Sequence, residues 1–397
     1  MAGPLNGVTV LDLSRILSGP YCTMLLRDLG AEVVKLEHPN GGDTARGNGP
    51  FLGEISSYFL SINRGKKSVT LDLSKPAGAE LLRRLARQAD VLVENFRPGT
   101  MARYGVGYET LAKVNPRLVY CAVSGFGQTG PYAHLPAVDV VVQGMGGIMS
   151  ITGEPGGPPV RPGASFGDIG AGLFSAVGVL AALWERAASG KGQMVDIGMM
   201  DCQVAILENA FSRFFASGEV PKPLGTRHPV STPFQAFQAS DGWVTVAIMG
   251  GLSDMWPLFC AAIERVDLMD NPDYATGWSR TQHYGDLEPA FREAFARRTV
   301  GEWVRIFQQA EIPCGPVQTI PQAAADPQMA AREMFVQAPR PDGPPVTLVN
   351  TPVKLSRTPG AVDALSPALG EHTDAVLAQW LGMTPAEIAA LRADSVV

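Results

Sequence analysis

Val8-Thr-Val-Leu-Asp-Leu13 and Ala31-Glu-Val-Val-Lys-Leu36 are two short apolar stretches that predict neighbouring buried strands. Between them, Pro20 opens and Gly30 closes a helical segment, because proline suits the first turn of a helix and glycine the residue after the last. The alternation of strand and helix patterns continues through residues 67–73, 78–89, 90–93, 108–114 and 118–124. This order predicts an α/β fold in which helices cover both faces of a parallel sheet.

A second informative segment is Arg161-Pro-Gly-Ala-Ser-Phe-Gly-Asp168, which leads into the uncharged apolar residues 169–184. The apolar run predicts a helix that is buried all round. Asp168 would stand at its N-terminus, where free N–H groups favour a carboxylate, and a plain helix cap is the simpler interpretation. The glycines around Asp168 would also let a ligand approach closely, so this aspartate is a candidate site residue.

The second half of the chain contains a predicted domain boundary. A strand is expected at residues 194–197 and a helix at 201–216, and the Pro- and Gly-rich residues 217–233 mark the boundary. Ser240-Asp-Gly242 then lies between two strand-like stretches and predicts a hairpin. The remaining expected elements are helices at 253–262, 287–297, 301–310, 373–381 and 385–391 and a strand at 346–355, with Thr299 as a helix cap.

The composition of the 397-residue chain, with 46% hydrophobic and 18% charged residues, is typical of a soluble enzyme. A net charge of −6 gives no general attraction for nucleic acid or an anionic membrane, so we expect neither as a partner. The five cysteines and five histidines are scattered, which predicts no disulfides and no metal site and suits a reducing cytoplasm. The sequence also predicts no signal peptide and no membrane span.

Two glycine motifs favour other reaction classes. Gly125-Phe-Gly127-Gln-Thr-Gly130 matches a dinucleotide fingerprint, but two prolines soon after it prevent the helix that would bind the pyrophosphate. We therefore expect a turn that lines a ligand cleft, and no nucleotide redox cofactor. Gly163-Ala-Ser165-Phe-Gly167 matches the elbow of serine hydrolases, but no strand precedes it and the helix is expected to begin nearer the aspartate. A hydrolase that uses Ser165, with His372 as its histidine, stays open as an alternative.

Two groups of basic residues are candidates for binding a phosphate. Asn63-Arg64-Gly-Lys66-Lys67 precedes an expected strand, and Arg97 and Arg103 follow another. Open α/β sheets bind ligands at strand ends, so either group could hold the phosphate that a negatively charged protein must bind locally. Asn95 and Phe96, beside Arg97, would suit hydrogen bonding and stacking of a base or a pantetheine amide.

Together, these pieces resemble the class III coenzyme A transferases, the family of carnitine and formyl-CoA transferases and of α-methylacyl-CoA racemases. The resemblance rests on the order and number of motifs from residue 4 almost to the C-terminus. These motifs are Pro4-Leu-Asn-Gly-Val-Thr-Val-Leu-Asp-Leu-Ser-Arg-Ile-Leu-Ser-Gly-Pro20, Gly30-Ala-Glu-Val-Val-Lys-Leu-Glu37, Gly42-Asp43, Asn63-Arg-Gly-Lys-Lys-Ser68, Val93-Glu-Asn-Phe-Arg-Pro-Gly99, Gly125-Phe-Gly-Gln-Thr-Gly-Pro131, Gly167-Asp168, Ile312-Pro-Cys-Gly-Pro316 and Leu369-Gly-Glu-His-Thr373.

The resemblance implies a two-domain architecture. A Rossmann-like parallel-sheet large domain would take residues 1–200 and be completed by residues 345–397. A linker helix and connector, 201–232, would lead to a smaller α+β domain, 233–325, and a return linker, 326–344. The resemblance also implies that two subunits interlock as an obligate homodimer.

The resemblance places Asp168 at the position of the family's catalytic aspartate. The implied reaction transfers CoA from an acyl-CoA donor to a carboxylic acid, through an aspartyl anhydride and an aspartyl-CoA thioester. It requires no metal and no ATP. Backbone N–H groups of glycines would stabilise the oxyanions, with Gly167 as one candidate. Gly250-Gly251 is the only stretch that could serve as the glycine-rich lid of formyl-CoA transferase.

By position in the motifs, a set of residues is expected to contact CoA: Ile16, Leu17, His38, Leu71, Asp72, Asn95, Phe96, Arg97 and Arg103. Two of them depart from formyl-CoA transferase, which has an arginine in place of His38 and a glutamine in place of Leu17. With the long lid missing as well, these departures argue against formyl and oxalyl substrates.

The α-methylacyl-CoA racemases are the main alternative within the family. That subgroup has a histidine immediately before the aspartate that corresponds to Asp139, whereas this chain has Val138 there and His134 is displaced. Without that imidazole, transfer of an α-proton lacks its acid–base group, so we favour a transferase.

The resemblance also indicates a substrate class. Pro159-Val-Arg161-Pro-Gly163 and the short small domain are most similar to family members that use dicarboxylates, with succinyl-CoA as donor. Arg15 or Arg161 could then pair with the distal carboxylate of the substrate.

Overall fold

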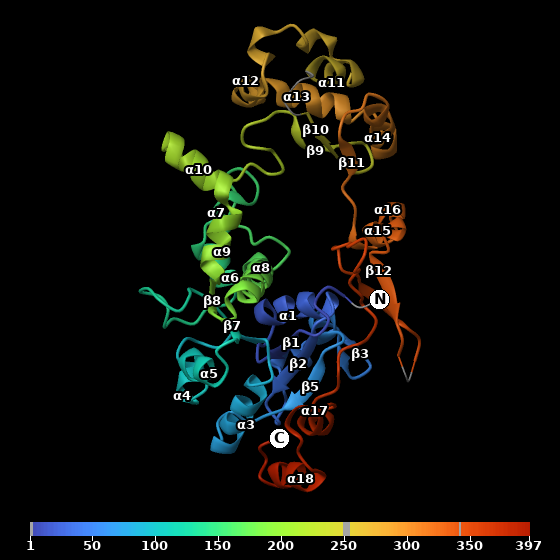
Figure 1. Ribbon diagram of the computed structural model, residues 1–397. Helices are drawn as coiled ribbons and strands as arrows, with labels where there is room; N and C mark the ends of the chain where they lie inside the picture. Colours follow the sequence, from blue (N-terminus) through green and yellow to red (C-terminus); the bar gives the residue numbers. More distant parts are fainter. Residues whose placement is uncertain (1–2, 249–254, 341–342) are drawn as a thin grey trace. The chain divides into compact units, whose positions relative to one another are not determined.

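The computed structural model describes residues 3–248, 255–340 and 343–397 (Figure 1). The chain forms two compact units. The large unit comprises Met1–Ile148, Arg161–Glu219 and Pro327–Val397, and the small unit comprises Met149–Val160 and Val220–Asp326.

The large unit is built on a six-stranded parallel sheet in the order β5-β2-β1-β6-β7-β8. Its strands are β1 (Thr9–Asp12), β2 (Glu32–Glu37), β5 (Lys67–Thr70), β6 (Val91–Glu94), β7 (Val119–Ser124) and β8 (Met194–Gly198). Each of these strands falls within or overlaps a stretch predicted as a strand. The parallel sheet confirms the predicted α/β class.

Two separate apolar cores cover the two faces of this sheet, because successive side chains of a strand point to opposite faces. Val10 and Val91 lie in a core with three helices, α1 (Ser18–Asp28), α8 (Phe166–Ser189) and α9 (Met199–Ile206). Leu11 and Leu92 lie in the other core, with α3 (Pro76–Ala86), α5 (Tyr108–Val114), α17 (Thr373–Leu381) and α18 (Pro385–Ala393). The sheet is therefore the middle layer of three.

The C-terminal segment belongs to the large unit. The backbone N–H of Thr70 donates to Thr373 Oγ1 at 3.1 Å, and that of Asp72 donates to the Val396 carbonyl at 2.8 Å. In Figure 1, α17 and α18 accordingly lie at the β5 edge of the sheet. A segment more than 300 residues away in sequence thus extends the layer that begins with α3.

Several smaller elements of the chain lie outside the sheet. They are the 3-10 helix η1 (Thr44–Gly47), the hairpin β3 (Phe51–Leu52) and β4 (Ile55–Ser56), α2 (Ser57–Asn63), α4 (Thr100–Arg103), α6 (Asp139–Met145), α7 (Ile148–Ile151), α10 (Glu208–Ser217), α16 (Pro327–Ala331), β12 (Phe335–Ala338) and β13 (Val346–Val349). The helix expected at 201–216 is divided into α9 and α10 at Leu207, whose ψ of 23° is not helical. The return segment 326–344 is more than a linker, because its strand β12 pairs with β13.

The small unit contains an antiparallel sheet in the order β11-β10-β9 and an aromatic core. Its elements are β9 (Phe234–Gln238), β10 (Trp243–Ala247), α11 (Trp256–Ala262), η2 (Val266–Leu268), η3 (Pro272–Tyr274), α12 (Gly277–Gln282), α13 (Tyr284–Phe295), α14 (Val300–Gln309), β11 (Cys314–Pro316) and α15 (Ile320–Ala324). The hairpin predicted around Ser240-Asp-Gly242 joins β9 to β10. Thr299 caps α14 as predicted, with its side chain accepting from the Glu302 N–H.

Helix α8 differs from its prediction in one respect. It is long and apolar enough to cross a membrane by length and composition, a property that core helices share. It was expected to be buried all round, but Leu173 is 47% exposed, Val177 64% and Trp184 83%. Residues spaced at four and seven positions lie on one face of a helix, so these three form an exposed apolar stripe.

Candidate active site

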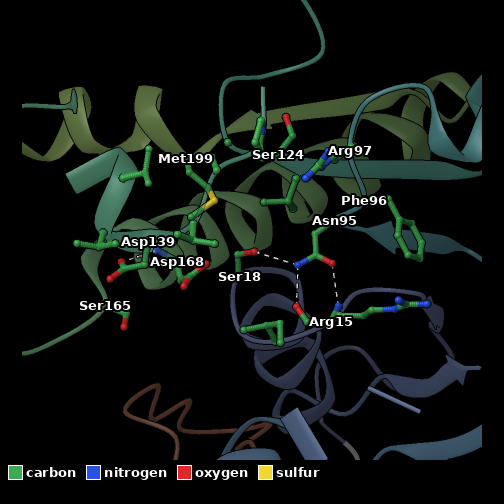
Figure 2. Close-up of a pocket in the computed structure, with 18 of the residues that line it drawn as sticks. Arg15, Ser18, Asn95, Phe96, Arg97, Ser124, Asp139, Ser165, Asp168 and Met199 are labelled. Carbon is green, nitrogen blue, oxygen red and sulfur yellow. Dashed lines mark hydrogen bonds between the residues drawn. The ribbon is translucent and has the colours of Figure 1, made fainter. Parts of the chain in front are cut away.

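The candidate site lies where the order of strands in the sheet reverses. From β1 the chain proceeds through β2 to β5 on one side, and then returns to place β6 on the other side of β1. Loops that follow β1 and β6 meet at such a point, which is where open α/β sheets bind ligands. A cavity of about 790 Å³ opens there, lined by residues that include Arg15, Ile16, Asn95, Phe96, Arg97 and Asp168 (Figure 2).

Asp168 lies in the first turn of α8, but it does not cap that helix. The helix begins at Phe166, and the capping carboxylate comes from Asp139, the first residue of α6. Asp139 Oδ1 accepts from the backbone N–H of Gly167 at 2.9 Å and from that of Asp168 at 3.4 Å. The interpretation of Asp168 as a plain cap is therefore wrong, and its carboxylate is left to line the cavity (Figure 2).

The charges around Asp168 are unbalanced. Arg161 is bound to Asp139, with 2.7 Å between Nη2 and Oδ2, and it also donates to Ser165 Oγ at 2.9 Å. Burial raises the pKa of Asp168 to about 7, the negative charge of Asp139 acts in the same direction, and Arg161 opposes both. A carboxylate with such a pKa is partly ionised near neutrality and is a stronger nucleophile than an ordinary one.

Gly167 has a different role from the expected one. Because its N–H already donates to Asp139, that group is not free to stabilise an oxyanion in this structure. A Cβ at Gly167 would lie 2.6 Å from Val142 Cγ2 and 3.0 Å from Asp139 Oδ1. The glycine thus permits the close approach of α6 that brings Asp139 to the helix. Gly250 and Gly251 lie outside the described residues.

Tyr58 also lines the cavity, although nothing in the sequence singled it out. It belongs to α2, whose start is capped by Ser56, with Oγ accepting from the Phe59 N–H at 3.1 Å. Burial raises the pKa of Tyr58 to about 12, and the charge of Asp168 contributes in the same direction. The phenol therefore keeps its proton and can donate a hydrogen bond within the cavity.

A second, smaller cavity of about 210 Å³ holds other residues from the expected CoA set. His38, Leu71 and Asp72 line it together with Arg15 and Phe96. The last two also line the large cavity, and the guanidinium carbon of Arg15 lies 5.0 Å from the centre of the Phe96 ring. The two cavities therefore share a wall at this stacked pair.

Two residues of the expected CoA set lie elsewhere. Leu17 is buried and lines a separate apolar cavity of about 750 Å³. Arg103 is exposed on α4 and donates to Thr100 Oγ1 at 3.2 Å. The structure therefore brings seven of the nine expected residues to the two cavities and leaves these two outside both.

The basic group at 63–67 is engaged in ion pairs, which makes it the less suitable of the two candidate groups for binding a phosphate. Lys66 is fully buried, and its Nζ lies 2.9 Å from Asp12 Oδ2. Arg64 pairs with Asp28 at 2.5 Å and Lys67 with Glu32 at 2.6 Å. Burial lowers the pKa of Lys66 to about 8 against the effect of Asp12, and an ammonium held in this way has a structural role.

Neither glycine motif has the backbone structure of the site that it resembles, the dinucleotide-binding turn or the elbow of serine hydrolases. Gly127 and Gly130 have φ of 82° and 91° in a turn, and Gly125 lines the large cavity, as expected of a cleft-lining turn.

The serine motif also lacks the strand of a hydrolase elbow. Helix α8 begins directly behind Ser165, contrary to expectation, but a coil segment precedes this serine. Across the parts of the chain that the structure describes, no histidine lines the cavity. Ser165 thus has no triad partner there.

Comparison with known proteins agrees with this geometry. The sequence pattern of the family described as CoA-transferase family III matches residues 5–373. The chain is 38% identical to the succinate–glutarate CoA-transferase of Agrobacterium fabrum, with 95% of each chain covered. It is 41% identical to the acetyl-CoA:oxalate CoA-transferase of Acetobacter aceti, with 89% of this chain and 90% of that protein covered.

A solved structure supports the same assignment. The crystal structure of a CaiB/BaiF family protein from Brucella suis is 37% identical and superposes with a TM-score of 0.84. The match covers 96% of this chain and 100% of the Brucella chain. The family indicated by the motifs is thereby confirmed: the chain belongs to CoA-transferase family III.

Proposed function

We propose that this enzyme transfers CoA from an acyl-CoA donor to a carboxylic acid through covalent intermediates on Asp168. The single observation that carries this proposal is the Asp168 carboxylate, which lines a cavity at the switch point with a pKa raised to about 7. A nucleophile needs such a position, because it must reach a bound thioester and exist partly in its ionised form.

The reaction balances without a metal or net proton transfer. The ionised Asp168 attacks the thioester carbonyl of the donor, which releases CoA thiolate and leaves a mixed anhydride. The thiolate attacks the aspartyl carbonyl, which expels the donor acid and leaves an aspartyl-CoA thioester. The acceptor carboxylate then attacks this thioester, and the thiolate that leaves attacks the acceptor's acyl carbon, which frees Asp168 and forms the new acyl-CoA.

Dicarboxylates are the acceptors that the site and the relatives favour. Two relatives at 38% and 41% identity carry names with glutarate and oxalate as substrates, so the relatives do not support the expectation against oxalyl substrates. The cavity wall also contains Arg15 and Arg97, for which the described part of the chain supplies no carboxylate at ion-pair distance. A guanidinium can bind a carboxylate through two hydrogen bonds, so one of them suits the distal group of a dicarboxylate.

The decisive experiment is mass spectrometry of the intact protein after incubation with succinyl-CoA and trapping with hydroxylamine or borohydride. We expect a modification that maps to Asp168 and is missing in Asp168→Ala. Glu185→Gln is the matched control, since it removes an exposed carboxylate from the other end of the same helix. A panel of glutarate, oxalate and monocarboxylates would then identify the acceptor, and transfer to monocarboxylates alone would contradict the dicarboxylate assignment.

Absence of any adduct with several acyl-CoA donors would instead favour the racemase. Its test is uptake of deuterium at the α-carbon of a branched acyl-CoA. The described residues argue against this outcome, because Val138 precedes Asp139 and His134 does not line the cavity.

We also propose that the protein is a homodimer, in the interlocked form that the family resemblance implies. The exposed apolar stripe of Leu173, Val177 and Trp184 supports this proposal. Soluble proteins rarely expose such a surface to solvent, and a second copy of the chain could bury it in an interface. Sedimentation equilibrium should give twice the mass of the 397-residue chain, and Val177→Glu should weaken the dimer while Glu185→Gln does not. A monomer at all concentrations would contradict the proposal.

A further inference from the structure

The loop after β1, residues 14–16, is bound by side chains at five backbone groups. The Ser14 N–H donates to Asp12 Oδ1 at 3.0 Å, and its carbonyl accepts from Lys35 Nζ at 2.7 Å. Asn95 binds the next residue at both groups, accepting from the Arg15 N–H and donating to the Arg15 carbonyl, each at 2.8 Å (Figure 2). The Ile16 N–H donates to Asp43 Oδ1 at 3.1 Å.

This set of bonds accompanies an unfavourable backbone conformation at Ile16. Its φ is +66°, in the left-handed region that a β-branched side chain rarely adopts. Such a conformation persists only when surrounding groups hold it, and it is common at ligand sites. The hydrogen bond from the backbone N–H of Ile16 is accepted by Asp43, so this carboxylate holds the residue whose backbone is strained.

Asp43 is itself held rigidly. Its Oδ1 also accepts from the Ala45 N–H at 3.0 Å, and its Oδ2 lies 3.0 Å from Lys35 Nζ. The side chains of Asp43 and Lys35 are both fully buried, and Lys35 binds the Ser14 carbonyl as well. One buried ion pair therefore fixes both ends of the strained loop.

The loop presents two side chains to ligands. Arg15 lies against Phe96 at the wall shared by the two cavities, and Ile16 lines the larger one with Asp168. No carboxylate in the described part of the chain pairs with Arg15. A guanidinium at such a place is suited to an oxyanion of the substrate.

We propose that Asp43 is a positioning residue that keeps Ile16 in its left-handed conformation and thereby holds Arg15 where it binds an oxyanion of the substrate. The nature of that substrate rests on the proposed function, and the oxyanion is either a phosphate of CoA or the distal carboxylate of a dicarboxylate. Asp43 acts only through the loop and does not touch the reacting atoms.

The first experiment identifies which oxyanion Arg15 binds. In Arg15→Gln we expect about a 10-fold rise either in the Kd of CoA, measured by calorimetry, or in the KM of the dicarboxylate acceptor. A rise in the Kd of CoA assigns the phosphate, and a rise in the KM of the acceptor alone assigns the carboxylate. If neither constant changes by more than about 2-fold, the proposal fails.

The second experiment tests whether Asp43 acts through Ile16. Asp43→Asn, which removes the ion pair but keeps an acceptor, should raise the same constant about 10-fold in wild type and in Ile16→Val, with kcat changed less than about 2-fold. In Ile16→Gly the effect should fall below about 3-fold, because glycine adopts the left-handed conformation without help. An equal effect in all three backgrounds would overturn the proposal.

Two further measurements keep the result interpretable. The double variant Arg15→Gln/Asp43→Asn should resemble Arg15→Gln alone, whereas independent roles would multiply the two effects. If Asp43→Asn does not fold, the double variant Asp43→Asn/Lys35→Met, which removes both charges of the buried pair, replaces it with the same expectation, and no effect there overturns the proposal. Calorimetry with CoA needs no turnover, so missing adducts at Asp168 would refute the proposed function and leave the CoA-binding readout of this test intact.

Discussion

Two groups of buried or half-buried charges lie in the large unit, and their balance of charge differs. The buried charge cluster below the loop 14–16 has two carboxylates, Asp12 and Asp43, and two ammonium groups, from Lys35 and Lys66. The first turn of α8 has two carboxylates, Asp139 and Asp168, but only one guanidinium, that of Arg161. Burial alone raises the pKa of a carboxylate in both places.

The outcome is opposite in the two groups. The two ammonium groups lower the pKa of Asp12 far below its ordinary value, so this carboxylate stays ionised and structural. At α8 the single guanidinium is bound to Asp139, and the pKa of Asp168 rises to about 7. A count of opposite charges therefore separates a carboxylate that supports the fold from one that can react.

The largest effect is expected on stability, from Asp12→Asn. Loss of this carboxylate leaves Lys66 buried without its ionic partner, which costs about 3–5 kcal/mol in the free energy of unfolding. Urea denaturation at pH 7 measures it. Glu32→Gln, which breaks the half-exposed pair with Lys67, should cost less than about 1 kcal/mol. Equal losses in the two variants would show that the buried charge cluster is not special.

The next effect concerns the pH dependence of transfer. Activity should rise with pH through about 7 in wild type, because the proposed mechanism needs the ionised form of Asp168 as its nucleophile. Asp139→Asn removes the negative charge beside Asp168 and leaves Arg161 without the carboxylate that it binds. The midpoint of kcat/KM against pH should therefore move down by about 1 unit. An unchanged midpoint would mean that Asp139 does not influence the nucleophile.

Arg161→Gln should shift the same midpoint the other way. The guanidinium lowers the pKa of Asp168, so its removal raises the midpoint, by roughly half a unit given its partial exposure. Arg161→Lys keeps the charge and should leave the midpoint closer to that of wild type. A downward shift in Arg161→Gln would contradict the conclusion that the Arg161 guanidinium lowers the pKa of Asp168.

A last effect is a gain in stability in Asp168→Asn. Since the folded-state pKa of Asp168 lies above its ordinary value of 3.8, the folded state holds a proton that the unfolded state releases between pH 3.8 and about 7. Wild type therefore loses stability as pH rises through that range, whereas the amide does not. The melting temperature of the variant should exceed that of wild type by roughly 2 °C or more at pH 8 and match it near pH 4.

Local sequence patterns were sufficient for the layered fold of the large unit. Apolar runs such as that of β1 and the glycine after α1 act over a few residues, so they predict strands, helices and their order. The hairpin in the small unit and the cap at Thr299 were predicted for the same reason. The ordered motifs were also enough to indicate the family and to single out Asp168.

Partners that are distant in sequence were decided by tertiary structure alone. Lys66 has the same local pattern whether it faces a phosphate or binds Asp12, 54 residues away. Likewise, Asp139 caps a helix that begins 27 residues later, and Asn95 binds a loop 80 residues earlier. Burial, charge balance and the strain at Ile16 all arise from such contacts, because packing rather than local preference determines which side chains meet.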